Sequence, residues 1–394
     1  MSHSPNDFDP EVIEDFDSGH AEFARLRREC PVAHTEGLGG FWALTRYDDV
    51  RRAASDPATF ITSVQNVVPK VAFTGRRPPL HLDPPEHTPY RRTLNPLLSQ
   101  ERALRFEPYA RDCARKLLAP MIARGHGDIC GDFASFLPVQ VFGEWMNVPA
   151  HWVRPLHQSG RAFILAVNLN QPEQMKATSL KLYEMARELL ELRKAEPLDP
   201  AEDITSALLA ALERGEDMTE DLIVGMVRQV LVVGIVAPTV FMGSVAVHLS
   251  RHPDLQAQLR SDRSLVPAAV EEFLRLYTPY RGFARTAKCP VEFGGRTIQP
   301  GEGIALVYAS ANRDEAVFER SEEFLLDRDN IGEHLAFGRG PHNCPGIHLG
   351  RMQVRVMLDE LLDMTSHFEI DGPVAPARWP EIGAISVPLK FVPA

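Results

Sequence analysis

The chain has 394 residues, of which 44% are hydrophobic and 24% are charged, and this length is ample for a large buried core. Its net charge of -11 at pH 7 argues against nonspecific binding to nucleic acid or to an anionic membrane. The N-terminal segment is acidic and lacks the apolar core of a secretory signal, which favours a cytoplasmic enzyme. Five cysteines without C-x-x-C spacing argue against a disulfide framework or a structural zinc cluster.

Helical patterns predominate in the first half of the chain. Residues 19–30 have the spacing of an amphipathic helix, and residues 40–50 are typical of a strand that turns into a helix. The proline-rich residues 76–92 predict a loop until about His87, because consecutive prolines exclude regular helix. From residue 89 to about residue 215 the apolar period is mostly helical. Breaks in this pattern are expected near residues 124–128, 147–152 and 196–203.

Residues 230–247 form a run without charge that is long enough to span a bilayer. Gly234, Pro238 and Gly243 interrupt this run, and neither a second span nor an aromatic belt accompanies it. The pattern therefore favours a helix that is buried on all sides within a large helical protein.

The last third of the chain combines helices and strands. Residues 253–279 predict two more helices, and residues 291–308 predict short strands whose Gly-Gly and Pro-Gly pairs mark hairpin turns. No repeat, low-complexity tract or linker divides the sequence. The expected fold is mainly α with small β-sheets, in one large domain over residues 1–394 that we expect to be monomeric.

The stretch AFGRGPHNCPGIHLGR, residues 336–351, holds one cysteine in a stiff loop before a helical pattern. Gly338 and Gly340 allow backbone conformations that are closed to other residues, and Pro345 stiffens the exit. Amide groups and the helix dipole favour the thiolate of Cys344 over its thiol. Such a thiolate is suited to attack a substrate, to bind a soft metal or to ligate haem iron.

The order F-G-x-G-x-H-x-C-x-G, from Phe337 to Gly346, resembles the haem-binding loop of the cytochrome P-450 superfamily, the haem-thiolate monooxygenases. The resemblance implies haem b as cofactor, with Cys344 as the proximal iron ligand and Phe337, His342 and Gly346 beside it. It also implies that the haem is buried between the long apolar helix and the helix behind the cysteine. The resemblance covers nearly the whole chain and looks like the soluble bacterial type, without a membrane anchor.

Two groups of distant charged residues fit the same resemblance. Glu272 and Arg275 are three residues apart and share one helix face, so they are able to form an ion pair. The family's third member of this group corresponds to Arg328, and Ser321 stands at the family's usual proline. The two haem propionates need cationic or hydrogen-bonding partners once they are partly buried. Residues at the family's propionate-contacting positions are His87, Arg91, Arg285 and His342.

The long apolar helix departs from the family pattern. Members commonly carry an acid and a threonine there that relay protons to iron-bound dioxygen, whereas this chain has Val236 and Ala237. Thr239 lies about 200° around the helix from Ala237 and is a poor replacement. Pro238 cannot donate to the carbonyl of Gly234, so that carbonyl either holds a relay water or merely accompanies a kink over the haem. The catalytic candidates are Gly234, Ala237, Pro238, Thr239 and Cys344.

The segments at the family's pocket positions are largely apolar, which predicts a small hydrophobic or aromatic substrate. The candidate substrate contacts are Phe73, Phe163, Val233, Tyr280, Phe283 and Ile385. The expected reaction is insertion of one oxygen atom from dioxygen, by hydroxylation or O-dealkylation. Electrons are expected from an iron–sulfur ferredoxin or a flavin reductase, because the chain lacks a G-x-G-x-x-G dinucleotide loop after a strand. A basic docking patch for that partner is predicted from Arg92, Arg339, Arg351 and Arg355.

Three other functions stay open at this point. The missing acid and alcohol favour a peroxygenase, which takes its oxygen from peroxide. A haem-thiolate sensor or carrier is a non-enzymatic alternative, in which no substrate perturbs the haem. Catalysis by the Cys344 thiol without a metal, with His342 or His348 as base, is the last.

Overall fold

Helix-forming sequence fills the middle of the chain, and the longest helices of the computed structural model, which describes residues 6–70 and 74–394, lie there. Its α-helices are α1 (Ser18–Glu29), α2 (Tyr47–Ser55), α3 (Thr88–Leu97), α4 (Gln100–Arg105), α5 (Glu107–Ala123), α6 (Leu137–Trp145), α7 (Val153–Asn168), α8 (Pro172–Ala195), α9 (Ile204–Glu213), α10 (Glu220–Arg251), α11 (Pro253–Ser261), α12 (Val266–Leu276), α13 (Tyr308–Ala311) and α14 (Ile347–Met364). Its strands are β1 (Val32–Thr35), β2 (Phe41–Leu44), β3 (Phe60–Ile61), β4 (His126–Asp128), β5 (Phe283–Ala287), β6 (Val291–Phe293), β7 (Arg296–Ile298), β8 (Gly303–Leu306), β9 (Thr365–Ile370), β10 (Ala375–Pro376), β11 (Ala384–Ser386) and β12 (Pro388–Pro393).

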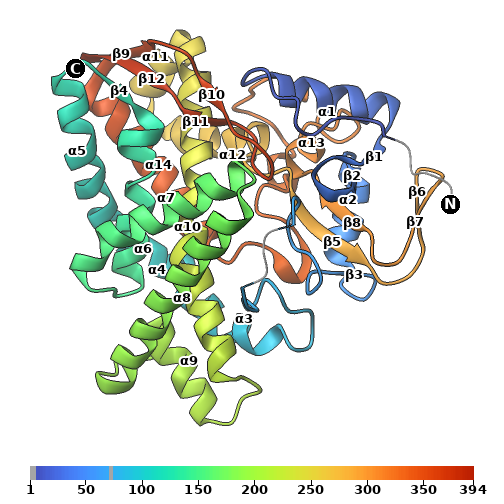
Figure 1. Ribbon diagram of the computed structural model, residues 1–394. Helices are drawn as coiled ribbons and strands as arrows, with labels where there is room; N and C mark the ends of the chain where they lie inside the picture. The colour runs from blue at the N-terminus through green and yellow to red at the C-terminus, as the bar shows by residue number, and fades with distance from the viewer. Residues whose placement is uncertain (1–5, 71–73) are drawn as a thin grey trace.

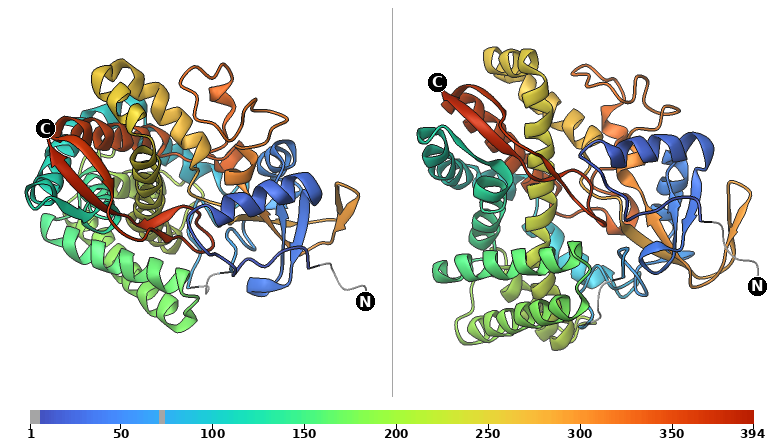
Figure 2. Two further views of the ribbon diagram at one scale, coloured as in Figure 1. Left: turned by 90° about the horizontal axis from the view of Figure 1, so that it is seen from above. Right: turned by 45° about the horizontal axis from the view of Figure 1, so that its top comes forward.

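The elements separate into a helical part and a part built around a sheet (Figures 1 and 2). Helices α5 to α10 and α14 gather on one side, and the largest sheet lies on the other with α1, α2 and α13. This sheet has the order β1-β2-β8-β5-β3, in which only β2 and β8 run parallel. A three-stranded sheet β4-β12-β9 and the pairs β6-β7 and β10-β11 complete the strands. The prediction of a mainly α fold with small sheets is therefore confirmed.

Helix α10 is the central helix of the helical part (Figure 1). The side chain of Thr219 caps it by accepting a hydrogen bond from the Leu222 amide at 3.3 Å. Within the described residues it is the one helix long and apolar enough to cross a bilayer, but 72% of its most apolar window is buried. Neighbouring helices α6, α7, α8 and α9 cover it, as expected of a core helix. The helix continues through Pro238 without a break.

Local sequence patterns located most elements to within a few residues. The helix expected over residues 19–30 is α1, and the strand and helix expected over residues 40–50 are β2 and α2. Strand β4 is different, because the sequence predicts only a break in helical structure near residues 124–128. Its backbone pairs with β12, with Gly127 opposite Leu389, so a partner far along the chain decides its conformation.

A buried network joins α12 to the segment that precedes the cysteine loop. The carboxylate of Glu272 accepts hydrogen bonds from Arg275 at 2.7 and 2.8 Å and lies 3.1 Å from Arg328. Arg275 also donates to the backbone carbonyls of Asn312, Ser321 and Glu323 at 2.6 to 2.9 Å. Glu272 and Arg275 have no exposed surface. Because Ser321 contributes its backbone carbonyl, its side chain has no direct part in this arginine contact.

Candidate haem-binding site

The cysteine loop is held by its own backbone and by α2. The amide of Cys344 donates to the carbonyl of Phe337 at 2.7 Å, which closes the loop before α14 begins. Gly338 and Gly340 have φ angles of 71° and 74°, where other residues are strained. A Cβ atom on Gly340 would lie 2.4 Å from the carbonyl oxygen of Ala54 in α2. Glycine at this position thus allows the loop to contact α2 directly.

The Cys344 thiol lies in a site that disfavours its ionisation in the protein alone. Burial raises the pKa of Cys344, against the opposing effects of the Gly346 amide, Arg91 and Arg351. A coordinated metal ion deprotonates a thiol outright and removes this penalty. The expectation that the start of α14 favours a thiolate is thus wrong for the protein alone, because burial outweighs the amide and the two arginines, and a free thiolate nucleophile is disfavoured there.

Basic side chains gather around this loop. Arg91 donates to the backbone carbonyl and the side-chain oxygen of Asn343 at 2.7 and 2.9 Å, which attaches α3 to the loop. The rings of His87 and His342 lie 4.6 Å apart, edge to face. Arg285, on β5, is buried and contributes to the low pKa of His342. The structure thus brings together the four residues that the sequence indicated for the propionates.

The two histidines are neutral hydrogen-bonding groups. Burial and then Arg91 lower the pKa of His87 to about 4, and burial and then Arg285 lower that of His342 to about 3. The Nε2 atom of His87 is buried and has no hydrogen-bond partner among the described residues. An unpartnered buried nitrogen beside Arg91 fits the carboxylate groups of a haem. The residues present therefore fit the cofactor that the resemblance implies.

One face of α10 is apolar and accessible. Val233 has 43% of its surface exposed although it lies in a core helix, and Ala237, one turn later, is partly exposed. Ile385 on β11 is 40% exposed. Accessible apolar side chains within the interior of a domain are typical of the walls of a ligand pocket.

The other candidates on α10 point elsewhere. A Cβ atom on Gly234 would lie 2.2 Å from the ring of Phe142, so the α-carbon of this glycine packs against α6. The hydroxyl of Thr239 lies 2.8 Å from the Ile235 carbonyl and 2.9 Å from that of Ala134, in η2 (Ile129–Ala134). The structure therefore separates Thr239 and the Gly234 α-carbon from the face that bears Ala237.

The predicted substrate contacts are only partly brought together. The rings of Tyr280 and Phe283 lie 4.4 Å apart, and the charge of Cys344 contributes, after burial and Glu381, to the raised pKa of Tyr280. Phe163 in α7 packs its ring 4.7 Å from the guanidinium carbon of Arg228 in α10. Phe73 lies outside the described residues. No motif contains Arg228, although as the last charged residue before the uncharged run it is visible in the sequence.

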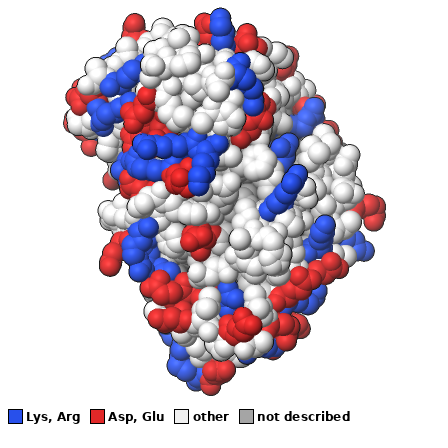
Figure 3. Space-filling model, turned by 90° about the vertical axis from the view of Figure 1, so that its left-hand side faces the viewer, with Lys and Arg blue, Asp and Glu red and all other residues white. Residues whose placement is uncertain are grey.

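The predicted docking arginines differ in their surroundings. Arg351 donates to Glu271 at 2.6 Å, and Arg355 pairs with Glu107, whereas Arg92 and Arg339 are exposed. Acidic and basic side chains also alternate over the face that contains α5 (Figure 3). The basic charge near α14 is therefore partly neutralised.

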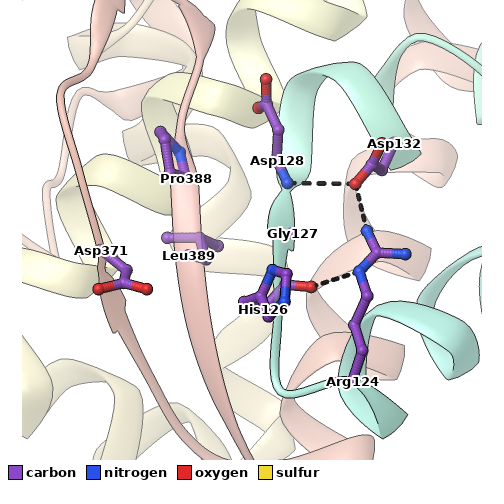
Figure 4. Close-up of a pocket in the computed structure, with 8 residues that line it drawn as sticks. All are labelled: Arg124, His126, Gly127, Asp128, Asp132, Asp371, Pro388 and Leu389. Carbon is purple, nitrogen blue, oxygen red and sulfur yellow. Dashed lines mark hydrogen bonds and ion pairs between the residues drawn. The ribbon is translucent and has the colours of Figure 1, made fainter.

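A surface pocket of about 430 Å³ lies beside β4 and β12, and it contains none of these residues (Figure 4). Arg124 in this pocket pairs with Asp132 and donates to the His126 carbonyl at 2.7 Å. Its polar groups thus largely satisfy one another. No cluster of three or more histidine, cysteine, aspartate or glutamate side chains suited to a metal ion occurs in the part of the chain that the structure describes.

Comparison with known proteins agrees with this site. A family model described as Cytochrome P450 matches residues 154–378. The chain is 31% identical to cytochrome P450 107B1 of Saccharopolyspora erythraea, over 91% of each chain, and 31% identical to mycinamicin IV hydroxylase/epoxidase of Micromonospora griseorubida, over 94% of each. The crystal structure of cytochrome P450 CYP101C1 has a TM-score of 0.87 and 28% identity, over 99% of each chain. The chain therefore belongs to the cytochrome P450 family and is a monooxygenase.

Proposed function

We propose that this monooxygenase hydroxylates or O-dealkylates a small substrate with an aromatic or otherwise apolar body, using haem b held by Cys344. The observation that carries the proposal is the fixed cysteine loop, around which His87, Arg91, Arg285 and His342 gather. Electrons come one at a time from an iron–sulfur ferredoxin or a flavin reductase, separate or fused. The enzyme acts in the cytoplasm as a monomer.

Each group around the loop has a defined task in this proposal. Haem supplies the activation of dioxygen at iron, and a cysteine thiolate ligand favours O–O cleavage. His87, His342 and Arg285 bind the propionates, and Arg91 also holds the loop through Asn343. Phe337, at the start of the loop, has its ring 5.0 Å from the guanidinium carbon of Arg351, and the Gly346 amide donates toward the Cys344 sulfur.

The substrate-binding role proposed for the apolar residues is supported by their exposure and by one aromatic contact. Tyr280 and Phe283 provide aromatic surface, and Val233 and Ile385 provide accessible aliphatic surface. Such a lining binds an apolar body through burial of its surface and orients it weakly. Selection of one position for oxidation therefore requires a polar contact in addition.

A peroxygenase is the second candidate, and one observation favours it. The accessible face of α10 presents Val233 and Ala237, and the hydroxyl of Thr239 is already occupied by two backbone carbonyls. Direct use of peroxide reduces the need for a side-chain proton relay. Turnover with peroxide compared with turnover with a ferredoxin and reductase distinguishes the two oxidants.

The Cys344→Ser variant tests the ligand. It should fold but lose the strongly red-shifted carbonyl band that ferrous thiolate-ligated haem gives. A Cys113→Ser variant, at a buried cysteine in α5, is the control and should retain the band. Survival of the band in Cys344→Ser would show that another residue binds the iron.

A further inference from the structure

Two arginines lie in the interior without an acidic partner. Arg77 precedes α3, and Arg228 lies in the first half of α10. Arg228 has no exposed surface and Arg77 is 8% exposed. No carboxylate is among the groups that shift the pKa of either residue, and residues 1–5 and 71–73, outside the described part of the chain, contain no Asp or Glu.

Several of their hydrogen-bond donors are unused. Nη2 of Arg228 donates to the hydroxyl of Ser179 in α8 at 2.9 Å, while its Nε and Nη1 are buried without an acceptor among the described residues. Nη2 of Arg77 lies 3.0 Å from Nε2 of His81, and its Nε likewise has no acceptor there. Aromatic rings of Phe163 and Tyr183 lie 4.7 and 5.8 Å from the Arg228 guanidinium carbon. Such ring contacts leave a guanidinium free to donate in its own plane.

This pair is unusual within the chain. Other deeply buried arginines have a carboxylate beside them: Arg27 pairs with Glu322, Arg193 with Asp203 and Arg275 with Glu272. Arg91 and Arg285 form no ion pair within the described residues, and both belong to the proposed haem site, where the propionates would supply the negative charge. By the same reasoning, Arg77 and Arg228 fit a negative charge that the chain itself does not provide.

The pair stays charged at neutral pH. Burial lowers the pKa of Arg228 to about 9, with a further contribution from the positive charge of Arg77. Burial lowers the pKa of His81 to about 3, so this neighbour is neutral. Two cations therefore share one interior site, and an anion bound there would relieve both their desolvation and their mutual repulsion.

The position of the pair connects it to the substrate. Phe163, a predicted substrate contact, packs directly on Arg228. Arg228 precedes Ala237 by nine residues on α10, which is about 14 Å along the helix axis and about half a turn around it. The segment that contains Arg77 and His81 leads into α3, which carries His87 and Arg91. The pair thus lies next to Phe163, a predicted substrate contact, and about two and a half helical turns before Ala237.

We propose that Arg77 and Arg228 bind an oxyanion on the substrate, a carboxylate or a sulfate or phosphate ester, at the end remote from the oxidised atom. This inference rests on the proposed function and adds the polar contact that the apolar lining lacks. The planar guanidinium fork matches such oxyanions, and Ser179 and His81 hold the two forks in place. The charged end then fixes which carbon or ether group of an apolar body reaches the haem.

The test uses the holoenzyme and pairs of ligands that differ in charge. Biphenyl-4-carboxylate is compared with biphenyl-4-carboxamide, and biphenyl-4-yl phosphate and sulfate identify the preferred oxyanion. We expect the carboxylate or one of the esters to bind about tenfold more tightly than the amide and to raise the melting temperature. Calorimetry and thermal melting measure ligand affinity without using the carbonyl band of the haem. A wrong assignment of Cys344 as the iron ligand would therefore be seen separately, in the Cys344→Ser experiment.

Variants then locate the anion site. Arg228→Met and Arg77→Met should lose the preference for the anion and bind the amide as the parent does. Arg187→Met is the control, because Arg187 is exposed and its guanidinium carbon also lies near the Tyr183 ring, at 5.9 Å. Should Arg228→Met fail to fold, Arg77→Met makes the same comparison. The proposal would be overturned if the parent enzyme bound the three anions no more tightly than the carboxamide. It would also be overturned if the preference for the anion survived in Arg77→Met.

Discussion

Glu272 is the residue on which two buried guanidinium groups depend. Replacing it by alanine leaves Arg275 and Arg328 in the interior without their carboxylate, at a cost of roughly 3–5 kcal/mol. We therefore expect Glu272→Ala to lower the melting temperature sharply and to reduce haem incorporation. Both quantities are measured on purified protein, by thermal melting and by the haem-to-protein absorbance ratio.

The matched control is Glu323→Ala. The Glu323 side chain pairs on the surface with Arg320, whereas its backbone carbonyl, which Arg275 uses, is unchanged by the substitution. Glu323→Ala should lower the free energy of unfolding much less than Glu272→Ala does, because an exposed ion pair contributes little. Wild-type stability and haem content in Glu272→Ala would contradict a structural role for the pair.

At the same scale, residue spacing located some site residues and missed others. His87 and Arg91 are four residues apart on one helical face, and the loop motif contains His342. Spacing and motif are therefore enough to assign these three residues to one site from the sequence. Thr239 is different, because the carbonyl of Ala134, far away in the chain, fixes where its hydroxyl lies. Arg77 and Arg228 stand out only once burial shows that neither has a carboxylate partner.

Helix α10 provides a prediction at the scale of one element. Pro238 has no amide hydrogen, so the Gly234 carbonyl lacks its usual donor, and Pro238→Ala supplies one. If that carbonyl holds a relay water, the variant should bind substrate normally but release severalfold more peroxide per product formed. Reductant consumed, peroxide released and product formed are measured together during turnover.

A second variant of α10 adds a side-chain proton relay instead of removing the possible water site. Val236→Asp with Ala237→Thr places an acid and an alcohol where side chains are partly exposed, so it should improve coupling if proton delivery is weak. Equal coupling in Pro238→Ala and the parent would make the proline a packing feature.

The ends of the elements show what local sequence determines. The uncharged run predicted a helix at residues 230–247, and α10 extends it to Glu220 and Arg251, because its polar N-terminal turns remain helical behind the Thr219 cap. At the position of strand β4 the sequence predicts only a break in the helical pattern. The strand forms by pairing with β12, which lies more than half the chain away, so a local pattern does not reveal it. Local signals therefore predict helices well and sheet edges poorly.

For the whole molecule, buried histidines predict acid sensitivity. Burial lowers the pKa of His157 to about 4, and those of His81 and His248 to about 3. Unfolded histidine titrates near pH 6.5, so between about pH 6.5 and 4 the unfolded chain binds protons that the folded chain excludes. Stability should therefore fall as pH falls, by about 1.4 kcal/mol per pH unit for each such histidine.

Urea unfolding of the holoenzyme at pH 7, 6 and 5 measures this slope. His157→Gln removes a ring stacked 3.8 Å from that of Phe136. It should reduce the slope of the unfolding free energy against pH by about 1.4 kcal/mol per pH unit, the contribution of one proton, even if it also lowers overall stability. The exposed His126→Gln variant should leave the slope unchanged. A slope that His157→Gln does not change would show that this histidine titrates alike in both states.

The contacts of Arg275 determine which substitutions the neighbouring positions accept. This arginine is joined to Asn312, Ser321 and Glu323 through their backbone carbonyls, which every amino acid possesses. A saturation library at position 321 should therefore keep this contact with any residue, and the buried site of Ser321 should restrict the functional clones mainly by side-chain size. A library at position 340 should return almost only glycine, because any Cβ meets the Ala54 carbonyl at 2.4 Å. Position 340 thus excludes every side chain, whereas position 321 excludes only those that do not fit its buried site.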